Sequence, residues 1–217
     1  MGHAGMAAAA VRYLRSTGPT GAALGAPVDA PVEALPRPEL RCVGEDERAV
    51  IAPAEFRNVL GTFATGVTVI TAPATTRGDD NGDGDSEDRP AGFACQSFSS
   101  LSLDPPLVTF MVGRTSTTWP RIARAGVFCV NILGAHQGDL CRGFAVSGTD
   151  KFAGVPYDAA PVTGSPRLAG TLAWIDCTIH AVHTGGDHLI VIGRVNALGT
   201  TGEDEPPPLL FHKGQFI

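Results

Sequence analysis

The sequence has no long apolar run and no cluster of basic residues. Its longest apolar stretches, such as residues 107–112, fall far short of the roughly 20 residues that a membrane-spanning helix needs. The 16 lysines and arginines are scattered along 217 residues and the net charge is −6, whereas a surface that follows nucleic-acid phosphates needs clustered positive charge. These absences predict a soluble protein with neither a membrane nor a nucleic acid as its partner.

The sequence also lacks any C-x-x-C pair among its five cysteines. The five are Cys42, Cys95, Cys129, Cys141 and Cys177. Such an odd set is typical of a reducing compartment, and it disfavours both a disulfide framework and a zinc site. We therefore expect a cytoplasmic protein in which most of these thiols are small core residues.

The chain divides into an N-terminal extension and one domain. Residues 1–48 are rich in alanine, glycine and proline without sustained periodicity, so we expect them to be flexible. The apolar stretch at 4–11 has no basic leader before it and is followed at once by arginine, so we do not interpret it as a secretory signal. Residues 49–217 are long enough for one well-packed domain, in which residues 73–90 are expected to form an acidic hairpin loop.

The acidic loop contains the sequence DDNGDGDSEDRP (79–90), which matches the first half of a calcium-binding loop. Pro90 stands where such a loop needs its bidentate glutamate, and no helices are expected on either side. We therefore favour a solvated connection between two strands over a calcium site.

The hydrophobic pattern predicts a mainly β domain. A helix is expected from Pro53, because Phe56, Val59, Leu60 and Phe63 then share one face. Further helices are expected at 116–126 and 136–145. Strands are expected at 67–71, 91–98, 106–113, 127–133, 171–184 and 188–199, with an edge strand at 209–216. Seven short strands without regular βαβ alternation indicate an antiparallel barrel or sheet with helices packed outside it.

Several common functional motifs are absent or incomplete. No G-x-G-x-x-G follows an expected strand, and neither a P-loop nor a G-x-S-x-G serine-hydrolase motif occurs. Three histidines surround the tight turn at 185–187, but the odd offset between His180 and His183 places them on opposite faces of a strand. We therefore expect no metal site.

Hydroxyl side chains gather instead around two neighbouring strand ends. Ser97, Ser99, Ser100 and Ser102 follow or lie near the end of one expected strand, and Arg114-Thr-Ser-Thr-Thr118 follows the next. Free amides and hydroxyls at a helix start, with an arginine nearby, would suit a phosphate monoester. A phosphate site beside an apolar strand predicts a flavin. Equally consistent with the residues alone are serines that merely form a turn and cap a helix.

Five blocks of the sequence carry a resemblance to a known family. They are FATGVTVIT (63–71), FSSLSLDPPLV (98–108), GRTSTTW (113–119), GVFCVNIL (126–133) and GDHLIVIGRV (186–195). In this order and spacing they resemble the flavin reductase family of small NAD(P)H:flavin oxidoreductases. The resemblance implies an antiparallel Greek-key split barrel with flanking helices that binds FMN or FAD. It also implies a homodimer that passes reduced flavin to a partner flavin-dependent monooxygenase.

The resemblance also implies which residues form the site. Those expected to bind cofactors are Gln96, Ser97, Phe98, Ser99 and Ser100 along the ring and ribityl chain, Ser116 and Thr117 with Arg114 at the phosphate, and Gly186, Asp187 and His188 on the nicotinamide side. His188 is the single catalytic candidate, and its alternative is a histidine that merely begins a strand. Trp119 and Phe152 are aromatic candidates for covering the ring, although core packing is the commoner role.

The expected reaction is hydride transfer from NADH or NADPH to the flavin, in which the cofactors carry the chemistry and the protein supplies geometry and charge. Two other functions remain open. The flavin could stay bound while a small organic substrate reacts, or the barrel could be a non-catalytic flavin-binding module. Lys151 and Arg142 are expected to be solvated surface residues.

Overall fold

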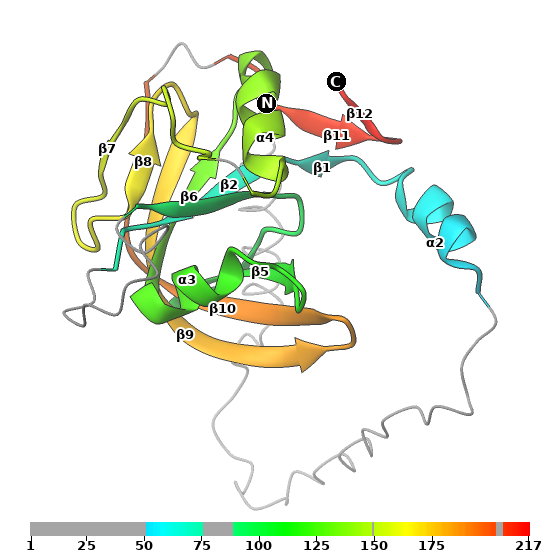
Figure 1. The fold of residues 1–217 in the computed structure, drawn as a ribbon, viewed down its shortest axis with the longest axis horizontal. Coiled ribbons are helices and arrows are strands. Elements are labelled where there is room, and N and C mark those ends of the chain that lie inside the picture. The colour runs from blue at the N-terminus through cyan, green and yellow to red at the C-terminus, as the bar shows by residue number, and fades with distance from the viewer. Residues whose placement is uncertain (1–50, 76–88, 149, 203–205) are drawn as a thin grey trace, which may run out of the picture. The chain divides into compact units, whose positions relative to one another are not determined.

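The computed structural model describes residues 51–75, 89–148, 150–202 and 206–217 (Figure 1). The N-terminal extension at 1–48 lies outside the described residues. So do residues 76–88, which hold most of the acidic loop and of its calcium-like sequence.

The domain is built on an antiparallel sheet of seven strands in the order β3-β2-β6-β9-β10-β5-β4. Its strands are β2 (Thr68–Ala72), β3 (Ala91–Cys95), β4 (Ser99–Leu103), β5 (Pro106–Gly113), β6 (Val127–Ile132), β9 (Ala173–Gly185) and β10 (His188–Thr200). The hairpin of β9 and β10 is the longest pair, and β5 and β6 flank it on its two sides (Figure 1). The expectation of a mainly β, antiparallel fold is confirmed.

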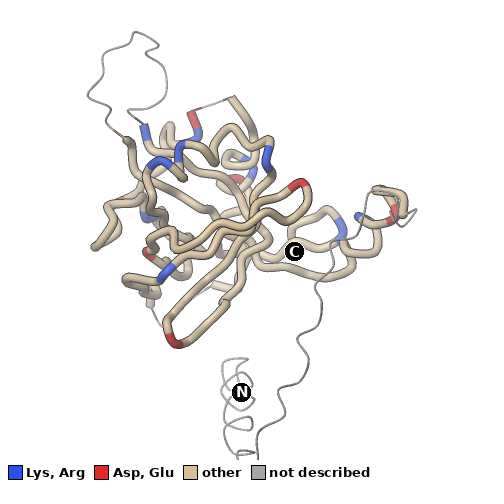
Figure 2. Tube along the Cα trace, turned by 90° about the horizontal axis from the view of Figure 1, so that it is seen from below, with Lys and Arg blue, Asp and Glu red and all other residues tan. Residues whose placement is uncertain are grey.

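Two small sheets and the helices complete the domain. The small sheets are β1 (Thr65–Gly66) with β11 (Leu210–His212) and β12 (Gln215–Phe216), and β7 (Tyr157–Ala159) with β8 (Pro166–Leu168). The helices are α2 (Pro53–Leu60), α3 (Trp119–Ala125), a 3-10 turn at Ala135–Gln137 and α4 (Gly138–Ala145). None of the described helices is both long and apolar enough to cross a membrane. Basic and acidic positions are distributed along the whole described trace (Figure 2).

Two expected strand boundaries were wrong. The strand expected over 91–98 is interrupted after Cys95, because β3 pairs with β2 whereas β4 pairs with β5 on the other side of the barrel. The expected C-terminal edge strand is a hairpin of β11 and β12, and Lys213 at its turn has a positive φ of 49°. The first break is a change of pairing partner, which local periodicity does not report, and the second is a tight turn that folds β12 back onto β11.

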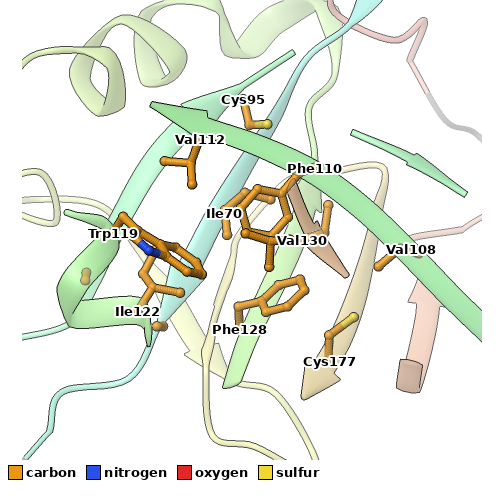
Figure 3. Close-up of a cluster of buried hydrophobic side chains, with 13 residues drawn as sticks. Ile70, Cys95, Val108, Phe110, Val112, Trp119, Ile122, Phe128, Val130 and Cys177 are labelled. Atoms are coloured by element: carbon orange, nitrogen blue, oxygen red, sulfur yellow. The ribbon is translucent and has the colours of Figure 1, made fainter. Parts of the chain in front are cut away.

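The larger core cluster is centred on Phe110 of β5 (Figure 3). Its ring meets those of Phe93, Trp119 and Phe128 edge to face, with centroids 6.0, 6.2 and 5.2 Å apart. Trp119, at the first turn of α3, is therefore a core residue that fastens this helix against the barrel.

Helix α2 forms as expected, but its apolar face is not buried against the described chain. Phe56, Val59, Leu60 and Phe63 remain 53%, 61%, 54% and 75% exposed. The end of the helix is fixed to the C-terminal hairpin by a bond from the Lys213 amide to the Gly61 carbonyl, 2.9 Å long. The helix therefore presents a contiguous apolar stripe that the described domain leaves uncovered.

Candidate functional site

A cleft of about 710 Å³ opens where the main sheet fails to close between the end of β3 and the end of β5. Its walls come from β3, β5, the turn after β5, α4, the start of β10 and the C-terminal hairpin. The volume lies within the range of about 300–1,000 Å³ that small-molecule sites usually have. Apolar side chains such as Val67 and Phe93 and a run of hydroxyls both line the cleft, so it suits a ligand with a flat apolar part and a polar end.

Ser97 connects the two strands at this opening. Its hydroxyl donates to the Met111 carbonyl at 3.0 Å and accepts from the Met111 amide at 2.9 Å. The Cys95 sulfur lies 3.3 Å from the same oxygen. β3 and β5 are not paired by main-chain hydrogen bonds here, and the Ser97 side chain connects them instead. Beside it, Gln96 is exposed and lines the cleft.

The hydroxyl-rich turn after β5 lines one end of the cleft. Thr115, Ser116, Thr117 and Thr118 all contribute to its wall. The Ser116 amide closes the turn onto the Gly113 carbonyl at 3.0 Å, and its hydroxyl accepts from the Trp119 amide at 3.2 Å. Ser116 thus satisfies the first amide of α3, although the N-cap position itself is Thr118, whose side chain makes no capping bond. Thr115 and Thr118 belong to the hydroxyl run noted in the sequence but were not among the residues predicted to bind the phosphate.

Lys151 reaches the same end of the cleft, and its expected place on the solvated surface was wrong. Its ammonium group donates to the carbonyls of Phe144 at 3.0 Å and Gly92 at 3.2 Å. Burial, and then the charge of Arg121, lower the pKa of Lys151. An ammonium group has three N–H donors, so one remains for a ligand.

Arg142 also lines the cleft, although it is largely exposed and pairs with Asp139. Its guanidinium lies over the ring of Phe216 with 5.1 Å between the guanidinium carbon and the ring centroid. Phe216 in turn packs edge to face on Phe211, so the C-terminal hairpin supplies an aromatic wall. No local pattern marks these two phenylalanines as site residues, because only the pairing of β11 with β1 brings them there.

His188 lies at the lip of the cleft at the start of β10. Its Nδ1 is 2.7 Å from Oδ1 of Asp187, and this hydrogen bond lowers the pKa of the exposed Asp187 carboxyl. The other ring nitrogen lies next to Gly113, where a Cβ atom would come within 4.0 Å of it. The histidine therefore has one nitrogen held by Asp187 and the other close to Gly113, which also lines the cleft.

The structure brings some predicted residues together and leaves others apart. Gln96, Ser97, Ser116, Thr117 and His188 line the cleft, and the residues outside its lining are Phe98, Ser99, Ser100, Arg114, Gly186 and Asp187.

The residues outside the lining have other placements. Phe98 packs against the core cluster, and the exposed Ser99 donates to the Ser100 carbonyl at 3.1 Å. Gly186, with φ of 65°, forms the turn before His188, and the Arg114 amide bonds to the Asp187 carbonyl at 3.0 Å. The predicted cofactor contacts of these residues stay predictions.

Comparison with known proteins identifies the family of the chain. Residues 60–217 match the model of the flavin reductase like domain. The chain is 48% identical over 166 residues to the flavin-dependent monooxygenase reductase subunit HsaB of Rhodococcus jostii, covering 76% of this chain and 77% of that protein.

Two solved structures are similar as well. Nitrilotriacetate monooxygenase component B of Mycobacterium thermoresistibile has a TM-score of 0.67 and 45% identity, over 76% of this chain and 84% of that one. The NADH:FAD oxidoreductase SgcE6 of Streptomyces globisporus, in complex with NAD and FAD fragments, has a TM-score of 0.66 and 32% identity, over 78% and 96% of the two chains. By its family match and by these relatives, the chain belongs to the flavin reductase like family, and its barrel is of that family's split type.

Proposed function

We propose that this protein is an NAD(P)H-dependent flavin reductase that supplies reduced FMN or FAD to a partner flavin-dependent monooxygenase. The observation that carries the proposal is the cleft between β3 and β5, which joins an apolar wall, a hydroxyl-rich turn, a lysine and a histidine. The relatives support it, since one is named a monooxygenase reductase subunit and another an NADH:FAD oxidoreductase.

The residues present fit a flavin. The turn at 115–118 and Lys151 would hold its phosphate, because hydroxyls and an ammonium group donate to phosphate oxygens. The strip from Ala94 to Ser97 would lie along the ring, with Gln96 and main-chain groups at its polar edge. Because the Ser97 hydroxyl is already used by Met111, we assign it to shaping the opening rather than to binding the ring.

When bound, the flavin supplies the redox chemistry, accepting a hydride from NAD(P)H and a proton from solvent to give reduced flavin and NAD(P)⁺. The protein contributes by holding the nicotinamide and the flavin ring close together in the orientation that hydride transfer needs. Asp187 orients the imidazole of His188 through Nδ1. Its Nε2 would then hydrogen-bond to the nicotinamide carboxamide, or the ring would offset negative charge on the reduced flavin.

A steady-state assay that varies free flavin at fixed NADH tests the proposal. Saturable dependence of NADH oxidation on added flavin is expected. A yellow protein whose turnover ignores added flavin would instead indicate a bound-flavin enzyme acting on a small organic substrate. Flavin binding without any NADH or NADPH oxidation would leave only a binding module.

Replacing His188 with alanine is expected to lower kcat/KM for NADH about tenfold, the effect of one lost hydrogen bond of roughly 1.4 kcal/mol. The Kd for FMN should stay within about twofold of wild type, because the phosphate contacts are assigned to the hydroxyl-rich turn and Lys151 and not to His188. The matched control is His183→Ala, an exposed histidine on β9 that does not line the cleft. Unchanged NADH kinetics in His188→Ala would show that this residue takes no part in the reaction with NADH.

We also propose that the protein is a homodimer in which the apolar face of α2 packs against the second copy. Four large apolar side chains at least half exposed on and just after one short helix support this proposal. Val59→Glu is expected to shift the protein from dimer to monomer in light scattering. Asn58→Glu, which adds the same charge at the neighbouring polar position, should leave the dimer intact. A Val59→Glu variant that remains dimeric would exclude this face.

We place the protein in the cytoplasm. Cys95, Cys129, Cys141 and Cys177 are free and buried, which supports a reducing compartment. Burial raises the pKa of Cys129 to about 12, so its sulfur is a thiol and packs as a small apolar group.

A further inference from the structure

A second cleft of about 430 Å³ adjoins the first. The two share Thr117, Thr118 and Lys151, so they meet where the flavin phosphate is proposed to lie. The volume of the second cleft is again within the range of about 300–1,000 Å³ for small-molecule sites. The proposed function does not use this space.

Three cationic side chains line the second cleft, from Arg89, Arg121 and Lys151. Main-chain carbonyls hold two of them in place. Arg121 donates to the carbonyls of Arg89 at 2.5 Å and Pro90 at 3.4 Å, while Lys151 donates to those of Gly92 and Phe144. The charge of Arg121 contributes to lowering the pKa of Lys151, so the two cations are held within electrostatic reach of each other. An anion between them would relieve this repulsion.

Asp150 is the one carboxylate in the described lining of the second cleft, and its oxygens already have partners. One oxygen pairs with Arg89 at 3.1 Å and the other accepts from the Phe152 amide at 3.2 Å. Phe152 adds an apolar surface, packed edge to face on Phe144 and Tyr157. Positive charge with an apolar ring beside it suits a phosphate attached to a base or sugar.

We propose that the second cleft binds the phosphorylated adenosine end of a dinucleotide, which is the adenylate half of FAD when FAD is the flavin substrate. The inference rests on the proposed function, because it takes the shared residues Thr117, Thr118 and Lys151 as the place of the first phosphate. FMN ends at that phosphate. FAD continues into a second phosphate and adenosine, and the second cleft offers two further cations, Arg89 and Arg121, beside the shared residues.

Equilibrium titration with FMN and with FAD, followed by quenching of flavin fluorescence, tests the inference without turnover. Arg89→Ala is expected to raise the Kd for FAD about three- to tenfold, a modest effect because this side chain is 62% exposed. The Kd for FMN should not change. The control is Arg194→Ala, which removes the same charge from an exposed position on β10 that lines neither cleft.

The nicotinamide cofactor also carries a phosphorylated adenosine. Calorimetric titrations with NAD⁺ and NADP⁺ test whether the second cleft binds this end instead of that of FAD. Weaker dinucleotide binding in Arg89→Ala, with FAD unaffected, would support the phosphorylated adenosine site and assign it to the nicotinamide cofactor. Equal weakening of FMN and FAD, or no change for any of the ligands, would overturn the inference. A wild-type protein that binds FAD through Arg89 but oxidises no NAD(P)H would contradict the proposed function alone.

Discussion

Replacing Lys151 with methionine is expected to raise the Kd for FMN about 10- to 100-fold, because a hydrogen bond to a charged group contributes roughly 1.5–3 kcal/mol. The methionine keeps the length and apolar character of the lysine stem and removes only the ammonium group. That group is partly buried at the hydroxyl-rich end of the cleft, with two of its donors used by carbonyls. Fluorescence titration measures the change.

Riboflavin provides the sharpest control, since it has the flavin ring without the phosphate. Its affinity should be the same in wild type and Lys151→Met, and a parallel loss for both ligands would mean that the substitution damages the cleft instead. The chain has one other lysine, Lys213, at the β11–β12 turn. Lys213→Met should leave both affinities unchanged.

The same contact predicts a pH dependence. A bound phosphate favours the ammonium form of Lys151, so FMN affinity should fall as the pH rises through the pKa of this residue. Because burial and Arg121 lower that pKa, the fall should begin at a lower pH than for an ordinary lysine. In Lys151→Met this alkaline decline should be absent.

Asp176→Ala is expected to lower the free energy of unfolding by about 2–4 kcal/mol and the melting temperature by about 5–15 °C. Asp176 is fully buried on β9 and fastens the loop between β7 and β8 to the main sheet. One carboxylate oxygen accepts from the amides of Val162 at 2.9 Å and Thr163 at 3.1 Å, and the other accepts from the Thr163 hydroxyl. Alanine leaves these donors without their partner. Thermal and urea unfolding measure the loss.

Asp176→Asn is the matched variant. Both amides bond to the same oxygen, so an amide side chain can retain both bonds and turn its NH₂ group toward the Thr163 hydroxyl. This hydroxyl can in turn donate to Ser165, whose Oγ is 2.7 Å away. The asparagine variant should therefore lose less than half of what alanine loses. Equal destabilisation by both substitutions would mean that the charge itself, rather than the bonding pattern, fixes the loop.

Local pattern was sufficient for most of the elements. Alternation and turn residues placed β5, β6 and the β9–β10 hairpin within a few residues, since these strands each have a buried face and a glycine-bounded end. The same reasoning failed at 96–98, where the chain leaves β2 and joins β5. A strand pattern reports which residues are extended, and it carries no information about which neighbour they pair with.

Some site residues were also visible in the sequence, and others were not. The run of hydroxyls at 115–118 and His188 beside its turn are visible as residue types next to strand ends, and the structure places them on one cleft. Lys151 looked like an ordinary surface lysine, because its neighbours Gly92 and Phe144 come from a strand 59 residues away and a helix seven residues away. Phe211 and Phe216 likewise become site residues only when the C-terminal hairpin docks on β1.

The sequence by itself determined an antiparallel β domain, its family and the chemical character of the residues around a phosphate, because these follow from side-chain type and short-range spacing. Only the tertiary structure decided which hydroxyls face the cleft, that Ser97 and Ser116 are partly used by the fold, and that Lys151 joins two adjacent clefts. Side-chain chemistry is local, whereas a binding site is made by contacts between segments distant in the sequence, which only the folded chain brings together.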